Sequence, residues 1–205
     1  MTPSNLSRLF AGLEALYGSE SGLDPHALLL PLPDDGSDVR ERVLVREADD
    51  GVLELGLAID DRTLAQLEAA PVDVALSDHA LGHTLPVLEG LSHVLYIAEA
   101  ARRERPVSGL ELETQAEVDK LAVCLLHRWA DARAQFERLV HRLFYSFELI
   151  ADAALQERYR TANRVALQFS RRLRPAVEAG RLEELRRMLQ RFWSASMTEK
   201  TALAA

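Results

Sequence analysis

The chain has 205 residues, 48% of them apolar and 27% charged, which is a globular composition with room for one core and a small subdomain. The net charge of −8 argues against nucleic acid as the main partner. The single cysteine, Cys124, excludes an intrachain disulfide and a thiolate zinc cluster.

No apolar run approaches the roughly 20 residues that a membrane span needs. The first residues also lack the basic region, apolar block and small-residue cleavage site of a secretory signal. We therefore expect a cytoplasmic, soluble protein that does not associate with membranes.

Residues 1–70 predict a small α+β subdomain. Leucines and aromatic residues recur every three or four positions over 4–17 and indicate a helix, which Ser4 can cap and Gly18 can end. Residues 19–41 carry three prolines and two glycines and predict a loop, with one short apolar turn at 27–30.

The β signal is confined to residues 42–59. Leu53, Leu55, Leu57 and Ile59 alternate with period two, so we expect one face of this strand to be buried. An Asp-Gly pair separates this run from 42–47 and predicts a hairpin with a bulge or a slightly longer loop.

A short helix over 61–69, capped by Asp60 or Asp61, should follow the hairpin. Residues 71–83 form a connector whose structure stays open, because 72–76 alternates like a third strand while the next residues favour a turn.

From residue 84 onward the pattern is helical, with Thr84 and Ser108 as N-caps of two successive helices. The apolar stripe after Ser108 continues to about residue 148, which is too long for one straight helix. We expect a break near Asp131 or within 148–152.

A further helix should cover 153–174 and another 182–192, with a turn marked by Pro175 and Gly180. The tail, 195–205, should fray. The predicted fold is therefore mainly α: an antiparallel helical bundle over 84–194, joined by the 71–83 connector to an N-terminal helix and hairpin.

One candidate site is a histidine–carboxylate cluster. Glu89 and His93 are one helical turn apart, and Glu117 on the next helix could approach His93 if the two helices run antiparallel. The full candidate set of metal ligands, for a divalent transition metal, is His79, His83, Glu89, His93 and Glu117.

Two other interpretations of this helix face are open. The spacing also fits a solvated surface pair, because the pair lies opposite the leucine stripe. Tyr96 shares the face and would be an anchor residue if the face were a protein interface.

The arginine-rich end is the remaining candidate. From Arg158 to Arg191 the chain has ten arginines against three acids, and Arg160, Arg164 and Arg171 lie on one side of a helix. Arginine forks pair with carboxylates or phosphates. This end could bind a partner with an acidic surface, and nucleic acid is the weaker alternative.

Nucleophile elbows, phosphate-binding loops and dinucleotide fingerprints are absent from the sequence. This favours a non-enzymatic interaction or accessory protein that binds another protein through a helical face or the hairpin edge, without a cofactor. The alternatives are a metal-binding bundle, enzymatic or not, and a binder of acidic partners or nucleic acid. Self-association stays open.

Overall fold

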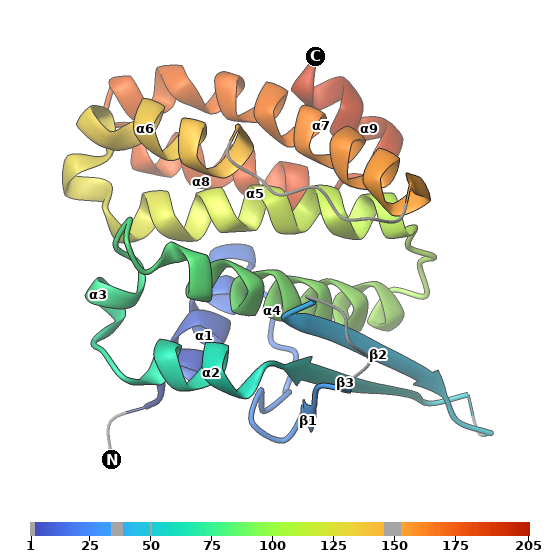
Figure 1. Cartoon of the computed structure of the whole chain (residues 1–205). Helices are drawn as coiled ribbons and strands as arrows, with labels where there is room; N and C mark the ends of the chain where they lie inside the picture. Colours follow the sequence, from blue (N-terminus) through green and yellow to red (C-terminus); the bar gives the residue numbers. More distant parts are fainter. Residues whose placement is uncertain (1–2, 34–38, 50, 146–152) are drawn as a thin grey trace. The chain divides into compact units, whose positions relative to one another are not determined.

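The computed structural model describes residues 3–33, 39–49, 51–145 and 153–205 (Figure 1). The chain is mainly helical with one small sheet, and it contains a helical bundle and a hairpin subdomain, as predicted. It forms two compact units, Met1–Pro106 and Val107–Ala205.

The boundary between the units falls after the long helix α4, Leu81–Arg102, and not within the predicted connector 71–83. α4 packs on α1, α2 and both long strands, so it belongs to the first unit. The leucine stripe indicated a buried helix but not which elements would cover it.

The sheet of the first unit has three strands in the order β1-β3-β2. β2 (Glu41–Glu47) and β3 (Leu53–Ile59) form the predicted antiparallel hairpin, closed by the Ala48 N–H donating to the Val52 carbonyl at 2.8 Å. β1 (Leu29–Pro31) pairs with β3 in parallel, where a turn was predicted. Three residues are too few to show periodicity, and Pro31 is tolerated because β1 is an edge strand.

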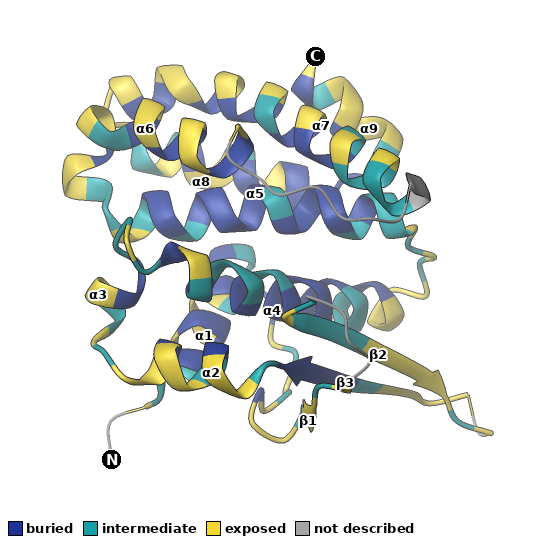
Figure 2. Cartoon of the chain, viewed as in Figure 1, coloured by how far each residue is buried: buried dark blue, intermediate teal, exposed yellow. Residues whose placement is uncertain are grey.

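The predicted burial of one β3 face holds only for the inner half of the strand. Leu57, Ala58 and Ile59 are buried on both faces, whereas Leu53 is 40% exposed although it shares the face of Leu57. The hairpin extends outward beyond α4, so position along the strand decides burial as much as side-chain alternation does (Figure 2).

α1 (Asn5–Tyr17) and α2 (Asp61–Glu68) begin and end as predicted, with Ser4, Gly18 and Asp60 at the caps. α2 also caps the N-terminus of α1. The Glu68 carboxylate accepts the N–H groups of Asn5 and Leu6 at 2.9 and 2.8 Å, satisfying two donors of the first helical turn.

Residues 72–76 are not a strand: α3 covers Val72–Ala75 as one helical turn. α4 then starts at Leu81, three residues before the predicted cap. Thr84 does not cap it, because its hydroxyl donates to the Ala75 carbonyl at 2.6 Å and ties the turn to α4.

The second unit begins with α5 (Gly109–His127), whose first turn Ser108 caps as predicted. A 3-10 turn, η1 (Trp129–Asp131), separates it from α6 (Ala132–Phe144), so the break near Asp131 is confirmed. The alternative break within 148–152 lies outside the described residues.

α7 (Ala153–Glu178) lies against α5, α6, α8 and α9 and is the central helix of the bundle (Figure 1). The turn predicted at Pro175 is wrong, since α7 continues through it. Pro175 has no N–H to donate, but its carbonyl still accepts the N–H of Ala179 at 3.2 Å. The turn comes at Gly180, where φ is +65°.

α8 (Leu182–Trp193) packs Phe192 on Phe169 of α7, with ring centroids 4.1 Å apart. The predicted fraying from 195 onward is wrong. α9 covers Met197–Ala204 and starts with a capping box, in which Ser196 and Glu199 satisfy each other's backbone N–H groups. These hydrogen bonds from Ser196 lower the pKa of Glu199 below its ordinary value.

Among the helices within the described ranges, none combines the length and the apolar character that crossing a bilayer requires.

Candidate functional site

The histidine–carboxylate pair on α4 is inside the protein. Between Val87 and Tyr96 every residue is buried except Glu89, which is half-buried. His93 is only 8% exposed. The interpretation as a solvated face is therefore wrong. Small and apolar residues occupy all sides of these turns, which leaves α4 without a wide polar face.

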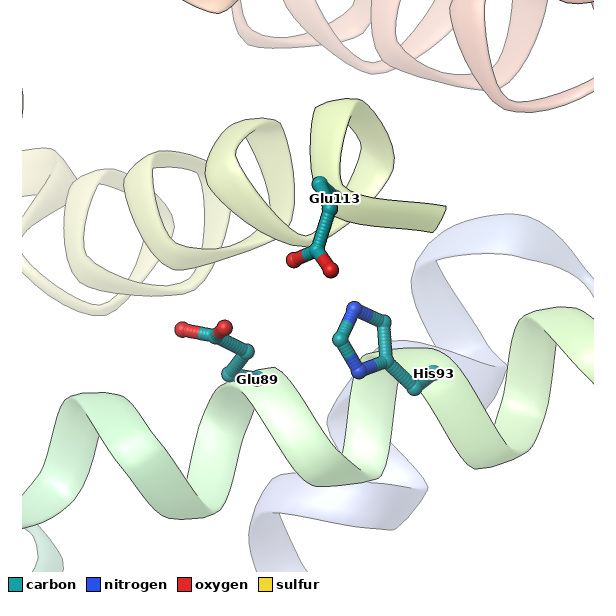
Figure 3. A group of neighbouring side chains, drawn as sticks. All are labelled: Glu89, His93 and Glu113. Carbon is teal, nitrogen blue, oxygen red and sulfur yellow. The ribbon is translucent and has the colours of Figure 1, made fainter. Parts of the chain in front are cut away.

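Glu89 and His93 project from the same side of α4, one turn apart, as the i, i+4 spacing predicts (Figure 3). The figure also draws Glu113, which α5 carries in the second unit. Within the first unit, Glu89 and His93 offer one carboxylate and one imidazole on the same side of α4. These donor types suit a divalent transition metal such as Zn²⁺ or Mn²⁺.

His79 and His83 lie near the start of α4, away from the pair formed by Glu89 and His93. His79 is exposed in the turn before α4, with its ring 3.2 Å from the Ser77 hydroxyl. His83 lies half-buried in the first turn of α4. Two turns or more of helix separate both residues from His93.

The carboxylates of α5 have cationic neighbours within the second unit. Glu113 accepts a hydrogen bond from Arg158 of α7 at 3.2 Å. Glu117, the predicted ligand, accepts one from Lys120 at 2.8 Å. Glu113 lies one turn before Glu117, on the same face of α5.

Gly90 allows the sheet to approach α4 beside Glu89. A Cβ at this position would lie 2.6 Å from Leu57 Cδ1 and 2.8 Å from Glu41 Oε2. Glu41 of β2 is therefore a further carboxylate held against the same stretch of α4.

Tyr96 is buried, with 2% of its surface exposed, and does not form an accessible anchor on a solvated helix face. Its hydroxyl accepts a hydrogen bond from Arg105 at 3.0 Å. The Arg105 guanidinium also lies 5.4 Å from the centre of the ring. Within the first unit, Tyr96 thus fixes the residues that follow α4.

The arginines Arg160, Arg164 and Arg171 are all exposed on α7, as the predicted basic face requires. Of the three, Arg171 borders a groove. This groove lies between α6 and α7, encloses about 430 Å³ and also includes His141, Tyr145 and Arg174 in its walls.

A buried polar network in the second unit was not predicted. Lys200 is fully buried and donates to Gln115 Oε1 at 2.6 Å and to the Phe192 carbonyl at 2.5 Å. Gln115 in turn donates to Asp119 at 2.7 Å. The sequence signal that could have revealed it is the Ser-x-x-Glu capping pattern at Ser196, which predicts that the tail is helical.

The outer half of the hairpin exposes apolar side chains. The exposed fractions are 44% for Leu44, 50% for Val45, 56% for Val52 and 40% for Leu53. β2 is an edge strand that pairs with β3 alone among the described strands. This is the largest concentration of exposed branched residues within the described part of the first unit.

Comparison with family models, with curated proteins and with solved structures finds no match to this chain.

Proposed function

We propose that this is a non-enzymatic interaction protein that binds a partner through the open edge of its hairpin. The observation that carries the proposal is β2, an edge strand whose outer residues, Leu44–Glu47, are all exposed. Exposed edge strands invite pairing with another chain unless they are short, charged or covered. β-strand addition of an extended partner segment would use this edge.

The register indicates which backbone groups the partner would contact. The Ala48 N–H and the Arg40 carbonyl both bond across to the β3 side. Because alternate residues of an antiparallel strand bond to the same neighbour, the even-numbered residues of β2 face β3. The odd-numbered residues Val43, Val45 and Glu47 therefore direct their N–H and C=O groups to the open edge.

Proline at position 45 tests the proposal sharply. Val45→Pro removes an N–H that faces outward and leaves the β2–β3 hydrogen bonds in place, which edge strands tolerate. Val45→Ala is the matched control, because it removes the exposed side chain and keeps the N–H. Peptides selected from a displayed random library on the wild-type protein should bind Val45→Ala and lose affinity for Val45→Pro.

Hydrogen exchange provides the second readout. A bound peptide should slow exchange at the amides of Val43 and Val45, and exchange within the hairpin should be equal in free Val45→Pro and free wild type. Equal peptide binding by Val45→Pro and wild type, with the hairpin intact, would contradict strand addition at β2.

Metal binding is the second candidate, favoured by Glu89 and His93, which lie one turn apart on the same side of α4. The test is elemental analysis of protein purified without a histidine tag. We expect stoichiometric Zn²⁺ or another divalent metal if the candidate is correct, with His93→Ala losing it and His79→Ala retaining it. A content below about 0.1 metal per chain would remove this candidate.

A further inference from the structure

The α6–α7 groove of the second unit combines an apolar floor with a polar rim. Phe136 and Val140 of α6 are 4% and 8% exposed and lie at its base, with Leu167 of α7 half-buried beside them. The groove encloses about 430 Å³. Pockets that bind small molecules enclose roughly 300 to 1,000 Å³ and are mostly apolar with a few polar groups.

The rim holds one arginine that no carboxylate neutralises among the described residues. Arg174 forms an ion pair with Glu137 across the groove, so those two charges cancel. Arg171 instead donates to the hydroxyl of Tyr145 at 3.4 Å, a long contact to a neutral group. A guanidinium carries five N–H donors, and this contact uses one of them.

Tyr145 is held in place although 57% of its surface is exposed. His141 stacks on its ring with centroids 5.5 Å apart, and Arg171 contacts its hydroxyl from the other helix. Contacts at its face and at its hydroxyl hold this exposed ring in place, so it forms a preformed wall of the groove. A ligand that packs on it would therefore cost less side-chain conformational entropy on binding.

We propose that this groove binds a small organic monocarboxylate, with its apolar body on Phe136 and Val140 and its carboxylate on Arg171. The arginine fork matches a carboxylate with two parallel hydrogen bonds. The two arginines and the one glutamate of the rim sum to a net charge of +1, which fits a monoanion better than a polyphosphate. This site is separate from the hairpin edge and does not depend on strand addition there.

The test uses 3-phenylpropanoate as the probe, titrated into the full chain and followed by calorimetry and by NMR shifts of α6 and α7 amides. The uncharged 3-phenylpropanamide is the matched ligand. The acid should bind at least about tenfold more tightly than the amide, because the amide cannot form charge-assisted hydrogen bonds to the arginine. Inorganic phosphate should bind more weakly than the acid, since it lacks the apolar body.

Variants locate the site. Arg171→Gln should weaken 3-phenylpropanoate binding about tenfold or more, whereas Arg160→Gln, on the same exposed side of α7 but outside the groove, should leave it unchanged. Val45→Pro should also bind the acid normally, which separates this proposal from the one about β2. Equal affinity for acid and amide, or equal effects of the two arginine variants, would overturn the monocarboxylate site.

Discussion

At the scale of single residues, Lys200 is the most informative. It is a cation with no exposed surface, and it is held by the Gln115 side chain, by the Phe192 carbonyl and by the face of the Phe192 ring, 4.5 Å from its centre. These contacts span α5, α8 and α9. A buried ammonium is tolerated only when its donors are used, so this lysine fixes the arrangement of three helices.

We expect Lys200→Met to lower the free energy of unfolding by about 2 to 4 kcal/mol, because two buried acceptors lose their donor while the volume is kept. Thr198→Ala, exposed on the same helix, is the matched control and should change stability by less than about 0.5 kcal/mol. Urea unfolding of the full chain measures both. A Lys200→Met protein as stable as the control would show that the network adds no stability.

At the scale of elements, glycine serves two different purposes in the first unit. Gly12 lies in the middle of α1, is exposed, and has nothing within 4 Å of a Cβ added to it. Gly90 lies in the middle of α4, where that Cβ would meet Leu57 and Glu41 of the sheet below 3 Å. Glycine therefore costs helix propensity at position 12 with no packing role there, whereas at position 90 it avoids a close contact with two side chains of the sheet.

We therefore expect alanine to have opposite effects at these two positions. Gly12→Ala should stabilise by about 0.5 to 1 kcal/mol through helix propensity. Gly90→Ala gains the same propensity, but overpacking a close contact costs about 1 to 3 kcal/mol, so the net change should be destabilising. Thermal unfolding of the two variants decides it, and two stabilised proteins would mean that the sheet can move away from α4 easily.

The caps of α2 and α9 predict an acid-sensitive stability. Hydrogen bonds from Thr63 lower the pKa of Asp60, and hydrogen bonds from Ser196 lower the pKa of Glu199. A carboxylate with a lowered pKa in the folded state stabilises fully above its ordinary pKa, and this contribution is lost as the pH falls through the lowered value.

We expect Glu199→Gln to be less stable than wild type at neutral pH and to match it in acid, below both pKa values. Ser196→Ala removes the serine side chain of the capping box and should lower the free energy of unfolding by about 1 kcal/mol at neutral pH. Chemical unfolding across this pH range provides the measurement. A constant difference between Glu199→Gln and wild type at every pH would contradict the role of the charge.

At the scale of the whole molecule, the two units differ in charge. The first carries 19 acidic and 8 basic residues, a net charge of −11, and the second carries 13 acidic and 16 basic residues, a net charge of +3. Each unit has its own buried side chains, so each should resist proteolysis by itself.

Trypsin should cut first between the units. Arg103 lies just after α4, its side chain is 53% exposed, and the next residue adopts the left-handed conformation with φ +50°. We expect two fragments of nearly equal length, and Arg103→Gln combined with Arg102→Gln and Arg105→Gln should suppress them. Early cuts inside α7, with its many arginines, would contradict independent packing of the bundle.

The sequence predicted most helix boundaries because their signals are local. Ser4, Gly18, Asp60 and Ser108 act on neighbouring backbone groups, and the structure places each at the predicted cap. The misses depend on distant contacts. β1 needs β3 to form at all, and the capping pattern at Ser196 indicates a helical tail without indicating that Lys200 packs against α5.

The candidate site shows the same limit. The i, i+4 spacing correctly placed Glu89 and His93 on one side of α4, but it could not show that this side is buried. Burial depends on what surrounds the whole circumference of the helix. For the groove at Arg171, the sequence predicted the exposed arginine face of α7. It did not predict the apolar floor of the groove, because that floor comes from α6, more than thirty residues earlier in the chain.

The close approach at Gly90 has an evolutionary consequence. A larger side chain at position 90 would displace the ends of the Leu57 and Glu41 side chains, so a shorter residue at position 57 or the loss of the acid at position 41 would make room for it. Among relatives of this chain, we expect these three positions, on one helix and two strands, to vary together. Such correlated substitution would identify related proteins with this fold even where the rest of their sequences has diverged.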